Sequence, residues 1–316
     1  MATIDELASS RNWFRGDPKL PFTAVVDDYL CESLDLPTAV TKIVQPVNEQ
    51  YTSGDQDTES LLWDLWYTIL HAAKKSSRSA PTPTANTMTE DQARAANLDP
   101  SLPSPGHLKL LDLLDTLKTS AEPTPPADKT PDDWVFRADG KVWSALVLFG
   151  PATREVLNDA PGDGSGYEDI ELRAWENLNA FLAHVARRRI ADLDRMAVFA
   201  LREGLERQHK SDDGEGRNGG RFRATEARKL DAVVSTAGIW ALILGEELWV
   251  RLGEGQNTAA AAAAAAAGVS GNDVIPQKRW DTWVERFQFL SCREDLALGT
   301  RELAAQAVAI MKRAHV

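Results

Sequence analysis

The stretch Pro276–Leu290, PQKRWDTWVERFQFL, has the clearest helical pattern in the chain. Trp280, Trp283 and Phe287 recur at the three- and four-residue spacing that places side chains on one side of an α-helix, and Val284 joins them there. Charged side chains fill the opposite side, namely Lys278, Arg279, Asp281, Glu285 and Arg286. Because each large aromatic side chain buries roughly 150–250 Å² in a core, the stretch predicts a helix that docks into a sizeable core built by the rest of the chain.

The same apolar periodicity recurs along most of the sequence and predicts further helices. The first of these helices is expected to start at Pro21 and the last to be capped by Thr300. The others are expected over Thr38–Val44, Thr58–Lys75, His107–Lys118, Lys141–Asn158, Tyr167–Arg188, Ile190–Gln208 and Thr225–Leu252. Pro37 is expected to end the first helix and open the second, Pro46 to limit the second and Pro151 to interrupt the fifth, because proline lacks the backbone donor. No regular alternation of strand and turn residues appears in the sequence. The predicted fold is all-α, a multi-helix bundle with long low-complexity loops.

Pro-, Ser-, Gly- and Ala-rich stretches separate the helices. We expect residues 1–20 to be a flexible N-terminus and 21–316 to form a single all-α domain, with 21–120 and 132–316 as the alternative subdivision. Loops are expected at 76–106, 121–131, 210–220 and 253–275. The last loop includes the low-complexity tract Ala259–Ala267, which is too short and too featureless to form a stable helix alone.

Charge and cysteine content limit the kinds of partner. The 316 residues hold 35 Lys and Arg against 47 Asp and Glu, a net charge of −12. An acidic surface repels phosphate backbones, so we expect neither nucleic acid nor a membrane as partner. Cys31 and Cys292 are the only cysteines and are expected to be two buried small hydrophobic residues. The sequence shows no signal peptide and no run of roughly 20 apolar residues, so we expect an intracellular, cytoplasmic protein.

Two acidic stretches resemble metal sites without completing one. The DDYLCE stretch, with Asp27, Asp28 and Glu32, invites comparison with the magnesium-binding carboxylates of all-α terpene cyclases. That chemistry needs a second metal site, and the only similar spacing is formed by Asp57, Ser60 and Asp64, one helix away. A solvated acidic face is the favoured interpretation.

The stretch DAPGDGSGYEDI resembles a calcium loop at Asp159, Asp163 and Gly164. Pro161 stands at its third position, however, and Ile170 stands at the twelfth, where a bidentate glutamate is required. The sequence therefore predicts a plain turn. We expect no metal and no other cofactor.

Three further patterns each have a functional and a structural interpretation. Arg217, Arg221 and Arg223 suggest an RNA-binding tract, but acidic residues lie beside them. His184 could act as a catalytic base in a pocket, although a histidine at a core or surface position is more common. Trp175, Trp240, Trp280 and Trp283 could line a ligand pocket between helices, whereas their helical spacing favours core packing. No catalytic, cofactor-binding or metal-ligating residue is therefore assigned.

Several segments resemble a family of fungal helical proteins classed as a domain of unknown function, found in filamentous ascomycetes. They are WENLNAF at 175–181, AGIW at 237–240, and RWDTWVERFQFLS followed by TRELAAQAVAIM within 279–311, with looser similarity at LLWDLWYTIL and WSALVLFG. The resemblance implies an intracellular all-α protein without established catalytic residues. Some relatives appear beside genes for secondary metabolism, which implies an accessory role.

Two function hypotheses follow. The first is a non-enzymatic interaction, scaffold or accessory protein with an unknown protein partner, because no assembled set of acid, base, nucleophile or metal ligands is evident. The second is a helical enzyme or small-molecule binder whose pocket is lined by Trp side chains. A closed Trp core favours the first hypothesis, and a pocket with convergent polar groups favours the second. The sequence predicts no oligomeric state.

Overall fold

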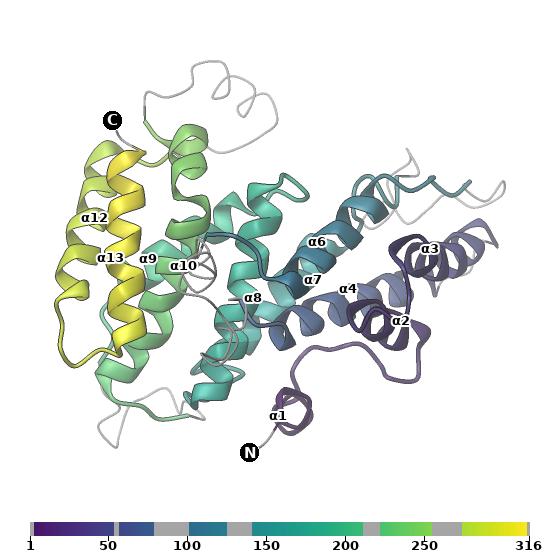
Figure 1. The fold of residues 1–316 in the computed structure, drawn as a ribbon, viewed down its shortest axis with the longest axis horizontal. Helices are drawn as coiled ribbons and strands as arrows, with labels where there is room; N and C mark the ends of the chain where they lie inside the picture. Colours follow the sequence, from purple (N-terminus) through teal and green to yellow (C-terminus); the bar gives the residue numbers. More distant parts are fainter. Residues whose placement is uncertain are drawn as a thin grey trace, which may run out of the picture. The chain divides into compact units, whose positions relative to one another are not determined.

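Regular structure in the described part of the chain is helical (Figure 1). The computed structural model describes residues 3–53, 57–78, 101–124, 141–210, 222–254 and 274–314. Within these ranges the only β-type pairings are two isolated bridges, Pro161 with Ser165 and Gly253 with Ile275. The predicted all-α fold is confirmed.

The chain divides into two compact units. Unit 1 comprises Met1–Pro81 and Pro103–Ser165, and unit 2 comprises Thr82–Leu102 and Gly166–Val316. The boundary at 165/166 differs from the alternative subdivision at 120/132, because the helix at 105–118 and the segment 141–165 pack with the N-terminal helices.

The central helix of unit 1 is α4, Thr58–Lys75. The other elements of this unit are α1 (Ile4–Arg11), α2 (Pro21–Leu30), α3 (Leu36–Ser53), α6 (Pro105–Lys118), α7 (Phe149–Val156) and the 3₁₀-helix η1 (Leu157–Asp159). Helices α2, α3, α6 and α7 all contact α4. Leu65, Trp66 and Ile69 on α4 are fully buried, which agrees with the prediction that this helix is apolar on nearly all sides.

Helix α3 is longer than predicted. It continues through Pro46, where the sequence predicts a stop, and ends at Ser53. Its buried stripe of Ala39, Ile43, Val47 and Tyr51 extends across the proline without interruption. Packing of this stripe outweighs the roughly 3 kcal/mol that an interior proline costs a helix.

The predicted helix over Lys141–Asn158 is wrong in its first half. Residues 142–148 form turns, and α7 begins only at Phe149. The carboxylate of Glu122 accepts hydrogen bonds from the backbone N–H groups of Val142, Trp143 and Ser144, at 2.7, 2.9 and 2.8 Å. These bonds anchor the start of the segment, and the left-handed conformations of Leu146 (φ 45°) and Leu148 (φ 68°) interrupt a helix there.

The N-terminal segment, predicted to be flexible over residues 1–20, is instead ordered from Thr3 onward. Thr3 and Glu6 form a capping box that starts α1. Ala8 is fully buried and Trp13 is 4% exposed. Figure 1 shows the extended stretch that connects α1 with α2.

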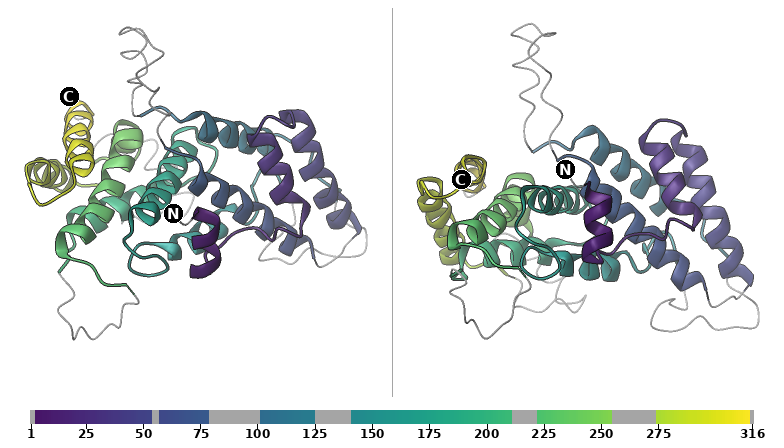
Figure 2. Two further views of the ribbon diagram at one scale, coloured as in Figure 1. Left: turned by 60° about the horizontal axis from the view of Figure 1, so that its bottom comes forward. Right: turned by 90° about the horizontal axis from the view of Figure 1, so that it is seen from below.

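Unit 2 is organised around α10, Glu226–Leu252, capped by the side chain of Thr225. Its other helices are α8 (Asp169–Arg187), α9 (Asp194–Leu205), α12 (Gln277–Ser291) and α13 (Leu298–Arg313). Helices α8, α9 and α13 pack on α10, and α12 packs on α13 and α9 (Figures 1 and 2). The close approach of α9 to α10 needs Gly204, because a Cβ atom there would lie 2.7 Å from the Val233 carbonyl oxygen.

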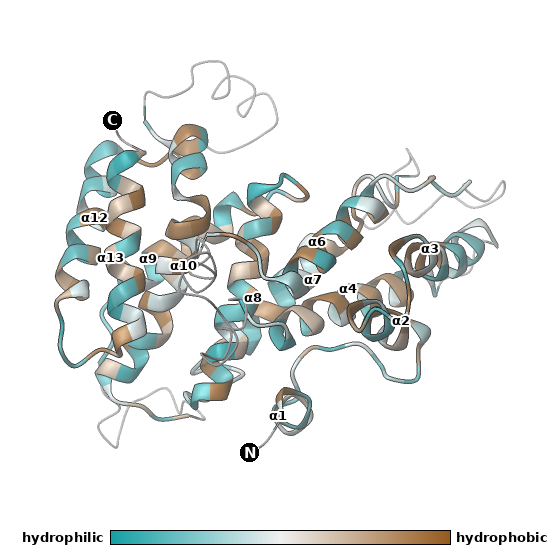
Figure 3. Cartoon of the chain, in the orientation of Figure 1, coloured by the Kyte–Doolittle hydropathy of each residue, from teal (hydrophilic) through white to brown (hydrophobic). Residues whose placement is uncertain are grey.

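The stretch Pro276–Leu290 forms α12 as predicted. Trp283 and Phe287 are fully buried and Trp280 is 1% exposed, whereas Glu285 lies on the opposite, more exposed side. The outward surface of α12 is mostly hydrophilic in Figure 3, and α4 and α10 carry long hydrophobic stretches.

The expected cap of the last helix is wrong. Thr300 lies buried inside the first turn of α13, which begins at Leu298. The carboxylate of Asp231, on α10, instead accepts a hydrogen bond of 2.9 Å from the backbone N–H of Ala297. The start of α9 is also later than expected, at Asp194 rather than Ile190, and Arg189 takes a left-handed conformation (φ 59°) after α8.

Most of the predicted loop at 76–106, residues 125–131 of the second loop, 211–220 of the third and the alanine tract lie outside the described residues. The ends of the last loop are held together, since Ile275 N–H donates to Leu252 O at 2.7 Å and Glu254 N–H donates to Ile275 O at 2.9 Å. In the described ranges α10 alone is long and apolar enough to cross a membrane, and 78% of its most apolar window is buried in the protein.

Candidate functional site

Among the described residues of unit 1, the most deeply buried charged group is the Lys74 ammonium on α4. Lys74 lies four residues after Leu70 and eight after Trp66, so it belongs to the buried face of α4. Its side chain is 2% exposed and forms an ion pair with Asp159, whose side chain is 5% exposed. Burial lowers the pKa of Lys74 below its ordinary value, although the charge of Asp159 opposes this shift.

Asp159 lies at the end of η1, and two further groups hold it in place. Its Oδ2 atom accepts a hydrogen bond of 3.2 Å from the backbone N–H of Phe14. Its carbonyl oxygen accepts one of 2.6 Å from the Ser165 hydroxyl. Burial raises the pKa of Asp159, and its bonds with Lys74 and Phe14 act in the opposite direction. The pair is therefore strongly desolvated on both sides.

The indole of Trp13 covers the Lys74 ammonium. Lys74 Nζ lies 4.7 Å from the centre of the ring, within the range of a cation–π interaction. The indole N–H donates to the Gly164 carbonyl oxygen at 3.1 Å, which fixes the ring between α4 and the turn after η1. A desolvated lysine can act as a nucleophile, but in this arrangement the amine cannot reach a substrate.

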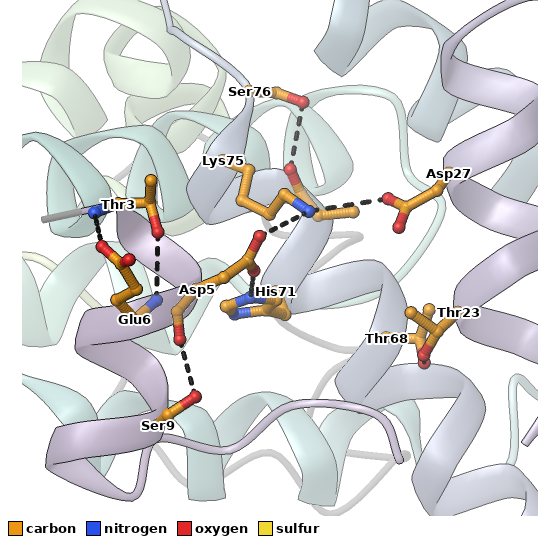
Figure 4. A network of polar contacts seen from close by, with 11 residues as sticks. Thr3, Asp5, Glu6, Ser9, Thr23, Asp27, Thr68, His71, Lys75 and Ser76 are labelled. Carbon is orange, nitrogen blue, oxygen red and sulfur yellow. Dashed lines mark hydrogen bonds and ion pairs between the residues drawn. The ribbon is translucent and has the colours of Figure 1, made fainter. Parts of the chain in front are cut away.

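A second polar group lies one turn away on α4 and is drawn in Figure 4. His71 Nε2 lies 2.7 Å from Asp5 Oδ1, and Lys75 Nζ lies 3.2 Å from Asp5 Oδ2 and 3.6 Å from Asp27 Oδ1. Burial is the main cause that lowers the pKa of His71, so its imidazole is neutral at neutral pH and Nε2 carries the proton donated to Asp5. Asp5 thereby joins α1 to α4.

Two more groups on α4 lie under the same N-terminal segment. Burial raises the pKa of Tyr67 to about 12, with the negative charges of Glu155 and Asp159 adding to the effect. The Tyr67 ring lies 5.2 Å from the ring of Phe14. Asp64 Oδ1 accepts a hydrogen bond of 2.6 Å from the backbone N–H of Asp17, and burial raises the pKa of Asp64.

Three tryptophans of unit 2, Trp249, Trp280 and Trp283, form a closed cluster. The Trp280 ring lies 5.0 Å from that of Trp249 and 6.3 Å from that of Trp283. Trp280, Trp283 and Trp240 are at most 1% exposed. A cavity open to a ligand would leave ring surface accessible, so these rings pack against the protein itself.

The indole N–H groups of Trp280, Trp240 and Trp283 each have a partner within unit 2. Trp280 donates to the Met311 carbonyl oxygen at 3.1 Å and Trp240 donates to Asn179 Oδ1 at 2.9 Å. Trp283 donates to Glu206 Oε1 at 2.9 Å, and Arg279 pairs with the same carboxylate at 2.9 Å. Trp175, the fourth tryptophan considered for a pocket, is only half-buried.

The outer face of α12 carries an exposed aromatic ring. Phe289 is 56% exposed, and the guanidinium carbon of Arg286 lies 5.3 Å from the centre of its ring. Exposed apolar side chains also occur elsewhere in unit 2, at Phe199 on α9 and Leu298 at the start of α13, which are 65% and 62% exposed. Aromatic and arginine side chains are enriched in protein–protein interfaces.

The acidic residues singled out from the sequence do not come together. Asp27 faces Lys75, and Glu32 Oε1 lies 2.9 Å from Lys109 Nζ. Asp64 is bound to the backbone of the N-terminal segment. Over the residues that the structure describes, no three His, Cys, Asp or Glu side chains lie close enough together to hold a metal ion.

The remaining candidates from the sequence, namely the calcium-like loop, His184 and the three arginines, lie in different parts of the chain. Residues 160–165 form the predicted turn, while Asp159 beside it pairs with Lys74. His184 is 4% exposed within α8. Arg223 is exposed, and Arg217 and Arg221 lie outside the described residues.

The expectation of two buried cysteines is wrong, because Cys31 and Cys292 are both exposed. Each follows the last residue of a helix, α2 and α12 respectively. Their side chains therefore lie beyond the apolar stripe of the preceding helix.

The polar cluster around Lys74 does not emerge from the sequence patterns. One signal was present, since Lys74 continues the apolar stripe of its helix, where a charged residue is unusual. A second signal was Trp13 within a segment otherwise interpreted as flexible. The partner Asp159 follows Lys74 by 85 residues and no pattern connects the two.

Comparison with known proteins supports a family assignment and nothing more specific. No curated protein and no solved structure matches the chain. One family model matches residues 92–287, which is more than half of the chain and includes α6 to α10 and most of α12. The chain therefore belongs to the family described as "Protein of unknown function (DUF3632)".

Proposed function

We propose that the protein is a non-enzymatic interaction protein that binds a protein partner through the outer face of unit 2. The observation that carries this proposal is the contrast between the two faces of α12. On the inner face Trp280 and Trp283 are covered and hydrogen-bonded, and on the outer face Phe289 and Arg286 are stacked and accessible.

An exposed aromatic ring supports binding because burying it in a partner removes a large apolar area from water. Phe289 already has its ring face oriented by Arg286, so less side-chain freedom is lost on binding. The alternative, a helical enzyme or small-molecule binder with a Trp-lined pocket, is less well supported, since Trp280, Trp283 and Trp240 leave no accessible ring surface.

The biological setting is part of the same proposal. The resemblance to fungal helical proteins supports a fungal, intracellular accessory protein, and neighbouring genes among those relatives suggest a link to secondary metabolism. The net charge of −12 supports a partner other than nucleic acid or an anionic membrane.

The test compares Phe289→Asp with Glu285→Ala, a change one turn earlier on the same exposed side of α12, so that loss of the aromatic ring is separated from loss of a neighbouring polar side chain. Both variants should unfold within about 0.5 kcal/mol of the wild type, as surface substitutions do. Quantitative crosslinking in native host cells should then recover a reproducible set of proteins with the wild type and with Glu285→Ala, and lose that set with Phe289→Asp.

A small-molecule screen provides the opposing result. A compound that raises the melting temperature of the wild type but no longer does so for Trp283→Phe would contradict the proposal and favour the pocket. Equal recovery of all crosslinked proteins by Phe289→Asp would also contradict it.

A further inference from the structure

The N-terminal segment Thr3–Asp17 contacts the last turns of α4 first and then runs back along that helix. Its first contacts join Asp5 to His71 and Lys75, near the end of α4. The contacts then proceed towards the start of α4, with Phe14 against Tyr67 and Asp17 against Asp64. Trp13 covers Lys74, which lies at the same end of α4 as the partners of Asp5. The segment therefore lies along a groove formed by α4 and the turn at 159–165.

The fit of the segment in this groove is specific and close. A Cβ atom at Gly16 would lie 1.9 Å from the Thr68 hydroxyl oxygen, so a larger residue would force the Thr68 side chain to move. Two backbone N–H groups of the segment, from Phe14 and Asp17, each meet a buried carboxylate of the groove. The groove thus recognises main-chain donors, one carboxylate and one indole.

The segment buries few apolar side chains: Leu7 and Ala8 within α1, and Trp13 after it, with Phe14 half-buried. Helix α1 has eight residues and only Leu7 and Ala8 of it are buried. A helix of this length is not stable by itself in water. Elements with few buried apolar contacts open at a low free-energy cost, well below that of global unfolding.

The groups beneath the segment favour its release. Lys74 and Asp159 are almost completely shielded from water while Trp13 and Phe14 are in place. Burying such a pair costs much of the energy that its attraction supplies. When the segment opens, the return of water to both charges therefore compensates for part of the packing that the segment gives up. A purely apolar groove would give no such compensation.

We propose that Thr3–Asp17 is a detachable strap, and that the groove it occupies along α4 is a docking site for a peptide segment with the same arrangement of carboxylate, indole and backbone donors. In this structure the strap itself occupies the docking site. This inference concerns unit 1 and is independent of the partner face proposed for α12.

The first test is native-state hydrogen exchange on the unaltered full chain. The amide protons of Phe14 and Asp17, both engaged with carboxylates of the groove, report strap opening. They should exchange at least tenfold faster than the amides of the α4 core at Trp66 and Ile69, and with little dependence on denaturant. Exchange of all four amides in one cooperative step would overturn the proposal.

The second test measures docking directly. A protease site replaces the exposed turn residues Pro18 and Lys19, and the folded chain is cleaved there. A fluorescent peptide of residues 1–17 is then added and followed by anisotropy. The peptide should displace the cleaved strap and show saturable binding. The uncleaved wild type should bind the peptide at least tenfold more weakly.

Two competitor peptides give the control. Trp13→Ala removes the indole that covers Lys74 and should compete at least tenfold more weakly than the unaltered peptide. Ser9→Ala changes an exposed residue whose hydroxyl bonds only within α1, and should compete within about twofold of the unaltered peptide. Absence of binding to a cleaved chain with native circular dichroism, or equal competition by both peptides, would overturn the docking site.

Discussion

Truncation of Trp283 tests whether the closed aromatic cluster holds unit 2 together. The side chain is fully buried, and its ring lies against that of Trp280. Burial of about 200 Å² at about 25 cal/mol per Å² gives an upper limit of about 5 kcal/mol. Because truncations of buried large aromatic side chains cost about 3–5 kcal/mol, we expect Trp283→Ala to destabilise the protein by an amount in that range.

The hydrogen bond of the indole can be separated from its packing. Trp283→Phe keeps most of the apolar ring but loses the donor to Glu206, whose carboxylate retains its ion pair with Arg279. The carboxylate is thus not left without a partner, and we expect a smaller loss of about 1–2 kcal/mol. Glu285→Ala, on the polar side of the same helix, should change the free energy of unfolding by less than about 0.5 kcal/mol.

Urea unfolding followed by far-ultraviolet circular dichroism measures these differences. Calorimetry should accompany it, because two compact units can unfold in separate transitions. A Trp283→Ala protein that unfolds within about 1 kcal/mol of the wild type would refute the core role and leave the aromatic stripe available for a ligand or partner.

The remaining predictions concern buried titratable groups of unit 1. Burial lowers the pKa of His107 to about 4, so below pH ~6.5 the unfolded chain binds a proton that the folded chain excludes. Stability should fall by about 3 kcal/mol between pH 6.5 and pH 4, and His107→Gln should flatten that part of a urea-midpoint profile; an unchanged slope would contradict this cause. Lys74→Met leaves Asp159 buried without its cation and should cost about 3–5 kcal/mol. The double change with Asp159→Leu should recover most of that loss in the same assay, and additive losses would show that the two residues do not act as a pair.

Helix positions were predictable because they depend on local patterns. The boundaries of α4 follow directly from its apolar stripe, and α12 was recognised from the spacing of Trp280, Trp283 and Phe287. In both helices the side chains that decide burial lie within two or three turns of one another. The spacing of apolar residues over that length of chain therefore indicates which side of each helix is buried.

The errors arose where a distant group decides local structure. Glu122 binds three consecutive N–H groups at 142–144 and anchors them beside Leu146 and Leu148, whose left-handed conformations interrupt the helix that the apolar spacing predicts. Asp231 supplies the hydrogen bond at the start of α13, a role assigned from the sequence to Thr300. In each case the deciding carboxylate comes from another element, and a local window contains no information about it.

The expected helix stop at Pro46 is wrong because tertiary packing outweighs the local effect of the proline. Pro46 was expected to limit a short helix, since its own backbone cannot donate to the preceding turn. The buried residues Ile43 and Val47 on either side of it gain more from tertiary packing than the missing hydrogen bond costs. Because packing energy depends on what faces the helix, the sequence of α3 alone does not determine where it ends.

The candidate site was harder to predict than the fold because its chemistry depends on burial. A lysine and an aspartate 85 residues apart have ordinary properties in a solvated chain. They become a desolvated pair only when Trp13 and Phe14 cover them, and that segment had been assigned to a flexible terminus. The strap and the pair therefore depend on each other: the covered charges give the segment its polar contacts, and the segment excludes the water that would make those charges ordinary. This mutual dependence makes the opening of one segment sufficient to change the electrostatic character of α4.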